Sequence, residues 1–513
     1  MSNYGAVDIG SNSVRMQAAE MMTGEPPRIL AEGRQVTRLG TSVFLNGAIS
    51  AEAMQETCAV LARFAETMNK AQVIGVRAVA TSAVRDAGNQ QEFLARSREA
   101  LGVPVEVISG QEEARLIHLG VQARWPHPRE TILIVDIGGG SAELIQGHAG
   151  ELAAAYSKPL GAVRLTELFL QNDPPTPLQL RRLDEYIQEK LAPAVESIGG
   201  IPYDRAIATS ATAAAVVCAI RKVPRSKRDT VDRLKASKSQ LDKLFDNLAK
   251  KNLEQRRKVQ GVGPRRAELI VAGSAVLKRT LEELNQKSLY YCAAGVRDGI
   301  VADLHARGVG LEAGRLDREQ LRAVRAMAAR YAVPLKHADK VASLGSTLFE
   351  LLRPVHRLPV PSGRILEAAA YLHDVGHYIS DTRHHKHSYY VVANSDLPGF
   401  TERERFMIAN LCRYHRKALP AAGHDNYKAL DANERGQLAA MIPLLRLADS
   451  LDLGREQRVG HLDVRVNGES VEIRIESAGD IELEEWAAQR VAAAFQQAYS
   501  RSLTVKSART ETT

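Results

Sequence analysis

Thr131-Ile-Leu-Ile-Val-Asp-Ile-Gly-Gly-Gly-Ser-Ala-Glu-Leu144 is the stretch that decides the fold of this chain. Its apolar run is too short for a globular helix and ends in a glycine turn, so the pattern predicts a buried strand. Glycines at 138–140 let backbone N–H groups approach an anion, whereas Asp136 and Glu143 offer oxygens to a hard cation. The stretch therefore indicates a site for phosphate and magnesium, although an ordinary hairpin turn would explain a lone glycine triplet.

A second glycine turn lies at the start of the chain. Tyr4-Gly-Ala-Val-Asp-Ile-Gly-Ser-Asn-Ser-Val-Arg15 again runs a short strand into an aspartate, Asp8, followed by glycine and small polar residues. Two Asp-Ile-Gly turns in one chain indicate two related halves that face a shared cleft. Such a duplicated phosphate-binding hairpin resembles the actin-like, sugar-kinase and Hsp70 superfamily, in which each half contributes one loop.

Composition limits the class of protein. The chain has 513 residues, 45% hydrophobic and 25% charged, which is enough for three or four domains. It shows neither an N-terminal signal nor an apolar run of the roughly 20 residues that span a bilayer, so we expect a soluble, cytoplasmic protein without membrane contact. The four cysteines have no paired spacing and indicate neither disulfides nor a cysteine metal site. The net charge of +8 favours polyanionic partners.

Alternating strands and helices are predicted up to about residue 124. The apolar stretches 28–32, 73–80 and 103–108 predict strands, and Ser50 is a suitable N-cap for an amphipathic helix that ends near 70. Arg85 lies in the first turns of a helix that begins at 81, where its charge and the helix N-terminus attract anions. A solvated surface arginine would explain the same position equally well.

Another helix begins at Ser109-Gly-Gln-Glu-Glu-Ala-Arg115, directly after a strand. Glu112 and Glu113 fall in its first turn, which the helix dipole explains without any catalysis. The place of Glu113 at the mouth of a strand, just before the segment that leads to Asp136, favours a role in the site.

Three motifs, in this order and spacing, resemble the exopolyphosphatase and guanosine pentaphosphate phosphatase family. They are Asp8-Ile-Gly-Ser-Asn-Ser13, Ser109-Gly-Gln-Glu-Glu-Ala-Arg115 and Val135-Asp-Ile-Gly-Gly-Gly-Ser-Ala-Glu143. Kinases and chaperones of the same superfamily share the glycine loops but lack the glutamate helix. The resemblance covers about the first 300 residues and, more loosely, the remainder, as in the long form of the family.

This resemblance implies a fold and a set of roles. Two α/β half-domains of the actin-like, ribonuclease H-like type would span 1–124 and 125–304. Glu113 would be the general base that activates water, and Asp136 and Glu143 would hold Mg²⁺, with K⁺ as a candidate activator. Thr209, Ser210 and Thr212 stand where a predicted strand turns into a helix and could line the cleft, although N-capping alone would account for them. The residues expected to bind phosphate are Asp8, Gly10, Ser11, Asn12, Ser13, Arg15, Arg38, Arg85, Gly138, Gly139, Gly140, Ser141, Thr209 and Ser210.

Residues 221–258 are rich in Lys and Arg and poor in aromatic residues. This indicates a charged helical surface, either a polyphosphate track or a merely solvated face, rather than a stacking platform for single-stranded nucleic acid. Nucleic acid is therefore not expected as a partner.

A linker at 307–315 leads to a different kind of region. Residues 317–458 have a helical pattern that contains His337, the pair His373-Asp374 and Asp449. This set resembles the HD phosphohydrolase superfamily, and its residue types suit a transition metal such as Mn²⁺, Fe or Zn²⁺. The resemblance to the exopolyphosphatase family implies that this all-α, HD-like domain is structural and forms a homodimer, so an inactive domain is an equal alternative to a metal site. Further candidate ligands are His377, His384, His385, His387 and His415.

Residues 459–506 are predicted to form a small α+β domain without identifiable chemistry. Alternating polar and apolar residues about Asn467-Gly468 predict a hairpin, and one amphipathic helix follows. We expect the residues after 506 to be disordered. The apolar positions of the predicted helix are Trp486, Val491, Phe495 and Tyr499.

The main functional hypothesis is a magnesium-dependent exopolyphosphatase that releases orthophosphate from the ends of polyphosphate. Guanosine pentaphosphate is an alternative or additional substrate, since no motif identifies a base pocket. A kinase or chaperone-like ATPase would use the same loops but would release ADP, and a polyanion sensor would bind without turnover. The hydrolase requires the Glu113 carboxylate to point into the gap between the two turns, opposite Asp136.

Overall fold

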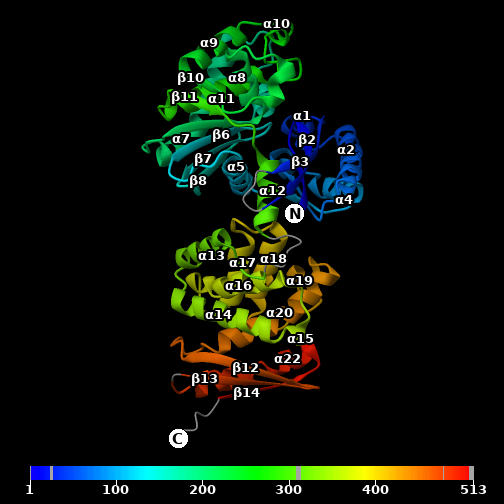
Figure 1. Ribbon diagram of the computed structural model, residues 1–513, viewed down its shortest axis with the longest axis vertical. Coiled ribbons are helices and arrows are strands. Elements are labelled where there is room, and N and C mark those ends of the chain that lie inside the picture. Colours follow the sequence, from blue (N-terminus) through cyan, green and yellow to red (C-terminus); the bar gives the residue numbers. More distant parts are fainter. Residues whose placement is uncertain (1, 23–26, 308–313, 478, 508–513) are drawn as a thin grey trace. The chain divides into compact units, whose positions relative to one another are not determined.

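The computed structural model describes residues 2–22, 27–307, 314–477 and 479–507. The chain forms two compact units, Met1–Gly310 and Leu311–Thr513 (Figure 1). Residues 308–313 of the predicted linker and 508–513 of the predicted disordered tail lie outside the described residues. Within the described residues, none of the helices combines the length and apolar character needed to cross a membrane. The finer division into four domains stays a prediction.

Two sheets of matching topology form the centre of the first unit. In each sheet, three neighbouring strands are antiparallel, and the third of them also pairs with a parallel strand. This third strand is β1 in one sheet and β6 in the other, so the two strands occupy equivalent places. The first sheet has the order β3-β2-β1-β4-β5 and consists of β1 (Ser2–Ile9), β2 (Ser13–Met21), β3 (Arg28–Val36), β4 (Gly75–Ala80) and β5 (Val105–Val107). The second has the order β8-β7-β6-β9-β11-β10 and consists of β6 (Thr131–Ile137), β7 (Ala142–His148), β8 (Glu151–Lys158), β9 (Arg205–Thr209), β10 (Lys235–Ser237) and β11 (Ser288–Tyr291).

Helices cover both sheets. Ser50 caps α2 as predicted, and Ser109 caps α5 where the sequence predicted a helix start. Each serine hydroxyl accepts a hydrogen bond from a backbone N–H three residues later. The helices that precede the second sheet in the chain are α1 (Leu39–Asn46), α2 (Ala51–Lys70), α3 (Ser82–Asp86), α4 (Gln90–Leu101) and α5 (Gly110–Arg124). The remaining helices of this unit are α6 (Ala162–Phe169), α7 (Pro177–Ile198), α8 (Ser210–Ile220), the 3₁₀ helix η1 (Arg225–Thr230), α9 (Lys238–Ala249), α10 (Leu253–Arg257), α11 (Ile270–Glu283) and α12 (Val296–Ala306).

Strand β6 is buried on both faces, which explains its uninterrupted apolar sequence. Ile132 and Ile134 belong to a core that contains α5 and α12 and residues of both sheets. Leu133 and Val135 belong to a second core with helices α7, α8 and α11. Since side chains alternate along a strand, Asp136 lies on the same face as Ile134, toward α5 and α12.

Helices α5 and α12 cross with their backbones in contact. A Cβ atom at Gly299 would lie 1.8 Å from the carbonyl oxygen of Leu116, and one at Gly120 would lie 2.5 Å from the carbonyl oxygen of Gly295. Any side chain would push the helices apart, so both positions require glycine. Through this crossing, α5 and α12 join the two halves of the unit.

A buried ionic network fixes the same two helices to the first sheet. Asp303 on α12 pairs with Arg77 on β4 at 3.0 Å and with Arg115 on α5 at 2.8 Å. Glu112 pairs with the same two arginines at 3.0 and 2.7 Å. Burial alone would raise the pKa of Asp303, but Arg115, Arg307 and Arg77 hold it well below its usual range. The network therefore anchors the first turn of α5, where Glu113 lies.

The second unit begins with a helical region and ends with a three-stranded sheet. Its helices are α13 (Arg318–Arg330), α14 (Leu335–Leu351), α15 (Arg353–His356), α16 (Ser362–Leu372), the 3₁₀ helix η2 (Val375–Tyr378), α17 (His384–Ala393), α18 (Glu402–Tyr414), α19 (Asp425–Lys428) and α20 (Ala432–Ser450). The C-terminal elements are β12 (Val459–Asn467), β13 (Ser470–Ser477), α21 (Glu482–Gln489), α22 (Ala492–Tyr499) and β14 (Ser502–Ser507), and the sheet order is β12-β13-β14. The likeness of the helical region to HD phosphohydrolases stays a prediction.

Two local predictions need correction. The basic segment 221–258 is only partly helical, because β10 joins the second sheet by pairing with β11. The C-terminal helix is two helices rather than one. The N–H groups of Arg490 and Val491 bond to carbonyls three residues earlier, and this tight turn separates α21 from α22. As a result Trp486 is 57% exposed, whereas Phe495 lies in the core.

Replacing Gly299 by alanine should lower the stability of the first unit, because its Cβ atom would overlap the backbone of α5. We expect an overpacking cost of about 1–3 kcal/mol and a fall in unfolding temperature of about 2–4 °C for each kcal/mol. Calorimetry can measure this, with Gly200→Ala as the control, because a Cβ at Gly200 meets no atom within 4 Å. Equal unfolding temperatures for the two variants would contradict the proposed contact.

Candidate active site

The two glycine turns have the same backbone geometry. The N–H of Gly10 donates to the carbonyl of Ser13 at 3.2 Å, and the N–H of Gly138 donates to the carbonyl of Ser141 at 3.0 Å. Each turn follows a strand whose last residue but one is an aspartate, Asp8 in β1 and Asp136 in β6. The structure therefore contains the duplicated hairpin that the sequence predicts.

Each turn is held from one side through its carbonyl groups. The carbonyl of Gly139 accepts from the N–H of Val163 at 2.8 Å, at the start of α6, and the carbonyl of Ser11 accepts from the N–H of Gly40 at 2.7 Å, at the start of α1. In a trans peptide the N–H points away from the C=O, so the amides that follow these carbonyls point to the opposite side. Both turns are thus built to present N–H groups to an anion.

The two turns touch each other. A Cβ atom at Gly139 would lie 2.8 Å from Cβ of Ser11 and 3.2 Å from the backbone nitrogen of Asn12. At Gly140 a Cβ would lie 2.1 Å from the hydroxyl of Ser82, which itself lies 3.1 Å from the Ser11 hydroxyl. Gly139 and Gly140 are required because the first turn and the Ser82 hydroxyl occupy the space that their side chains would need.

Four carboxylates converge at these turns. Glu143 on β7 lies opposite Asp136 in the strand pairing and accepts a hydrogen bond from the hydroxyl of Ser157 at 2.8 Å. Glu113 is 6% exposed, and the charges of Glu143, Asp8 and Asp136 all act on it. One buried oxygen each of Glu113, Asp136 and Glu143 has no hydrogen-bond partner. Buried carboxylate oxygens without donors fit a divalent cation as their common partner.

The pKa values of these groups are raised. Burial raises the pKa of Asp136 to about 6, against the effect of the nearby Thr209 hydroxyl. Burial and the charge of Asp136 raise the pKa of Glu143 to about 8. Burial and the charge of Glu143 raise the pKa of Glu113 well above its usual value, and burial raises that of Asp8. The site therefore resists carrying four negative charges unless a cation binds.

Glu112 and Glu113 are adjacent but have opposite environments. Glu112 lies in the ionic network, where Arg115 and Arg77 outweigh burial and lower its pKa. Glu113 faces three other carboxylates, and the charge of Arg85 opposes their effect only in part. The helix N-terminus, which would favour both carboxylates, does not decide the pKa of Glu113, because burial and like charges dominate there.

The predicted arginines differ in their positions. Arg15 pairs in register with Asp8, and its charge acts on both Asp8 and Asp136. Arg85 donates to the carbonyl of Ile108 at 2.7 Å and lies near Glu113. Arg38 is set apart, since its side chain is 62% exposed and pairs with Glu268 at 3.2 Å.

Thr209 and Ser210 lie beside Asp136 at the junction of β9 and α8. Thr209 is fully buried, and its hydroxyl, with that of Ser210, acts to lower the pKa of Asp136. Ser210 has a φ of 80°, which is strained for a residue with a side chain. This geometry fits orientation of the aspartate more directly than contact with phosphate.

A group of arginines that sequence reasoning missed adjoins the site. Burial and the charges of Arg15, Arg228 and other arginines lower the pKa of Arg34 to about 10. Burial and the charges of Arg34, Arg15 and Arg228 lower the pKa of Arg266 to about 9. These side chains stay protonated at neutral pH, so their mutual repulsion favours a bound polyanion. Only Arg228 lay within the basic segment that the sequence identified.

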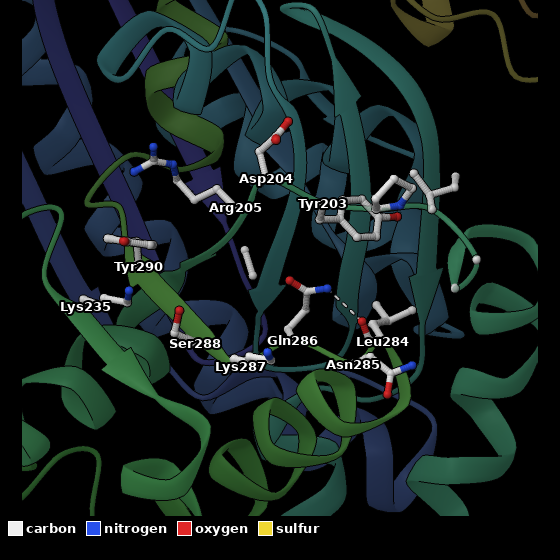
Figure 2. Close-up of a pocket in the computed structure, with 15 residues that line it drawn as sticks. Tyr203, Asp204, Arg205, Lys235, Leu284, Asn285, Gln286, Lys287, Ser288 and Tyr290 are labelled. Atoms are coloured by element: carbon white, nitrogen blue, oxygen red, sulfur yellow. Dashed lines mark hydrogen bonds between the residues drawn. The ribbon is translucent and has the colours of Figure 1, made fainter.

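A cavity of about 530 Å³ lies elsewhere on the second sheet (Figure 2). Arg205 and Lys235 line it, together with Tyr290. Arg205 begins β9 while Thr209 ends it, so the cavity and the carboxylates lie at opposite ends of this strand. It is therefore separate from the candidate active site.

The residues predicted to bind metal in the second unit also come together. Ligand atoms of His337, His373 and Asp449 lie within 4.8 Å of one another, as do those of Asp374, His377 and His384. The other two candidates on α17, His385 and His387, belong to neither group.

Paired glycine turns on matched half-sheets, with carboxylates at the ends of the parallel strands, define a phosphoryl-transfer protein of the actin-like class. The sequence profile of the Ppx/GppA phosphatase family matches residues 17–307, and that of domain III of this family matches residues 320–488. The chain belongs to the Ppx/GppA phosphatase family. This confirms the resemblance noted in the sequence, the actin-like fold of the first unit and the prediction of a hydrolytic enzyme.

Several relatives are similar over long segments. A protein of Vibrio vulnificus (strain YJ016) named guanosine-5'-triphosphate,3'-diphosphate pyrophosphatase is 29% identical over 88% of this chain and 87% of its own. The solved structure of a Ppx/GppA family member from Aquifex aeolicus is 31% identical, with a TM-score of 0.52, over 59% of this chain and 96% of that chain. An exopolyphosphatase from Cytophaga hutchinsonii is 25% identical, with a TM-score of 0.55, over 60% of this chain and 99% of that chain.

Replacing Glu113 by glutamine should stabilise the metal-free protein increasingly as pH rises. Carboxylates whose pKa is raised in the folded state bind extra protons there, so the stability they confer is present at low pH and lost as pH rises through the folded pKa. The unfolding temperatures of Glu113→Gln, the wild type and the exposed control Glu66→Gln can be compared in chelator. A pH range of about 5 to 9 covers the titration of Asp136 and Glu143. A difference from wild type that shrinks with rising pH would argue against the carboxylate cluster.

Proposed function

We propose that this protein is a metal-dependent phosphohydrolase that removes the terminal phosphate of guanosine pentaphosphate. One observation carries the hydrolytic part of the proposal: the buried carboxylate of Glu113, with an unpartnered oxygen, beside the two glycine turns. The name of the Vibrio relative supports the nucleotide substrate. This name favours guanosine pentaphosphate, the alternative substrate predicted from the sequence, over inorganic polyphosphate.

Asp136 and Glu143 are the residues we propose to hold Mg²⁺. Their unpartnered oxygens and raised pKa values fit a bound divalent cation, which would favour their charged forms. When bound, the ion would neutralise charge on the phosphate oxygens during transfer. The expected activation by K⁺ stays a prediction.

The residues of the chain would then position the terminal phosphate and the attacking water. Amides of the turns beginning at Gly10 and Gly138 bind the oxygens of the terminal phosphates, and Arg15 and Arg85 add positive charge. Glu113 accepts a proton from the attacking water as the water oxygen bonds to the terminal phosphorus. The bond from that phosphorus to the bridging oxygen breaks, so orthophosphate forms and the rest of the nucleotide leaves. Phosphoryl transfer needs little more than this base, a cation and aligned donors.

Polyphosphate is a second candidate substrate, favoured by the arginines that adjoin the site. Arg34, Arg228 and Arg266 repel one another, which favours a ligand with several negative charges beyond the reacting phosphate. The 3'-diphosphate of the nucleotide or successive units of polyphosphate could meet this need. The cytoplasmic location and the homodimer expected from the sequence stay proposals.

Replacing Glu113 by glutamine should abolish phosphate release while binding of guanosine pentaphosphate persists. Loss of a general base costs about 10²- to 10⁴-fold in rate, whereas an uncharged side chain removes repulsion from the anion. Phosphate release and calorimetric binding can be measured together, with the exposed Glu66→Gln as the control. Binding without phosphate release by the wild-type protein would instead identify a sensor, and ADP release from ATP would identify an ATPase.

Replacing Arg34 by glutamine should raise KM for the preferred polyanion by about 10- to 100-fold, the equivalent of one charged hydrogen bond. Arg28→Gln is the matched control, because Arg28 lies on the same strand and already pairs with Glu20 at 2.7 Å. Side-by-side assays of guanosine pentaphosphate, polyphosphate and ATP, with and without magnesium, would rank the substrates. Equal KM values for the Arg34 and Arg28 variants would remove the arginines from the binding site.

A further inference from the structure

Seven histidine and aspartate side chains meet at the ends of helices in the second unit. Among the described residues, none of the carboxylates of the candidate active site belongs to this group. Its members come from α14, the end of α16, η2, the start of α17, the end of α18 and α20, so residues far apart in sequence converge. They are His337, His373, Asp374, His377, His384, His415 and Asp449.

Their spacing is that of ligands around metal ions. Oδ1 of Asp449 lies 3.6 Å from Nε2 of His337 and 3.4 Å from Nε2 of His373. Oδ1 of Asp374 lies 3.6 Å from Nε2 of His373 and 3.6 Å from Nε2 of His384. Two ligands at about 2.1 Å from one metal, separated by about 90° to 110°, lie about 3.0 to 3.4 Å apart. The observed distances are close to this range and too long for good hydrogen bonds.

The other ring nitrogen of each histidine has an acceptor of its own. Nδ1 of His337 lies 2.8 Å from Asp452, and Nδ1 of His373 lies 2.8 Å from the carbonyl of Ala370. Nδ1 of His415 likewise lies 2.7 Å from a backbone carbonyl, that of Cys412. A proton on Nδ1 satisfies each acceptor and leaves the lone pair of Nε2 directed into the cluster. Hydrogen bonds of this kind orient metal-binding histidines in proteins.

Several buried nitrogen atoms of the cluster lack a suitable hydrogen-bond partner. Nε2 of His337 and of His373 has no hydrogen-bond partner, although these side chains are only 2% and 0% exposed. Nε2 of His384 lies 3.3 Å from Nε2 of His415, so at least one of these two nitrogens would need a proton in the absence of another partner. A cation satisfies all of these groups at once.

We propose that this cluster is a site for two divalent transition-metal ions. One ion would be held by His337, His373 and Asp449, and the other by His384 and His415, with His377 beside them. Asp374 would bridge the two ions, because its Oδ1 lies between Nε2 of His373 and of His384. Imidazole and carboxylate ligands of this kind select Mn²⁺, Fe²⁺ or Zn²⁺ rather than Mg²⁺.

The open side of the cluster is suited to an anion of the phosphate class. His377 is 34% exposed and Asp449 is 25% exposed, so solvent reaches the site. Arg455 donates to the second oxygen of Asp374 at 2.7 Å, and a guanidinium nitrogen of Arg416 lies 3.3 Å from His384. Two metal ions flanked by arginines would bind the oxygens of phosphate or of a phosphate ester.

Metal content of the full-length protein tests the proposal. After reconstitution with Mn²⁺ or Zn²⁺ and gel filtration, the wild type should retain about two ions per chain more than Asp374→Asn. His415→Gln should lose about one ion. The control His387→Gln, a histidine on α17 outside both groups, should lose none. Equal metal content in the wild type and Asp374→Asn would overturn the proposal.

A second measurement separates this site from the proposed phosphohydrolase. In Co²⁺-loaded protein, inorganic phosphate should shift the visible absorption of wild type and of Glu113→Gln, but not that of Asp374→Asn. Conversely, Asp374→Asn should keep phosphate release from guanosine pentaphosphate, which depends on the first unit. No spectral response in Glu113→Gln would show that phosphate acts only at the first site and would overturn the anion assignment.

Discussion

The backbone contact between helices α5 and α12 is the constraint on which the rest of the first unit depends. Both helices lie in the core that the two sheets share, and the glycines at 120 and 299 let them approach to the distance of their main chains. Asp303 and Glu112 then draw arginines from β4 and α5 into one ionic network beside the crossing. Removing one partner from such a buried network leaves an uncompensated charge, so its members depend on one another.

This rigid crossing explains how Glu113 can be held where it is unfavourable. A buried carboxylate near three others would turn toward water if its helix could move. The ionic partners of its neighbour Glu112 fix the first turn of α5, and the side chain at 113 is thereby directed at the turns. The stability of the ionic network thus offsets the unfavourable burial of the Glu113 carboxylate. In enzymes, unfavourable groups at the active site are commonly held in place by stable structure around them.

The candidate metal sites of the two units differ in their ligands. In the first unit, carboxylates alone create a demand for a cation, and oxygen ligands of this kind suit Mg²⁺. In the second, histidines whose Nδ1 atoms have acceptors direct Nε2 into the cluster, and such ligands suit softer ions. The same principle applies in both units, since buried groups that lack donors require positive charge.

Much of the fold could be predicted from local sequence. The run at 131–137, the two Asp-Ile-Gly turns, the Ser50 cap, the helix start at Ser109 and the hairpin at 467–468 all formed as expected, because each depends on neighbours in the chain. The family resemblance is confirmed, whereas the roles assigned to individual residues stay proposals. The C-terminal helix was predicted wrongly because its apolar spacing did not show that a tight turn would interrupt it.

The sequence by itself determined the strands, the turns and the residue types that can meet phosphate and metal, since periodicity and glycine placement act over a few residues. Only the tertiary structure decided which charges face one another. Arg34 and Arg266 lie on segments more than two hundred residues apart in the chain, and the opposite pKa shifts of Glu112 and Glu113 arise from partners on other elements. Electrostatic energy depends on distance and burial in space, and neither is encoded in the order of residues along a single segment.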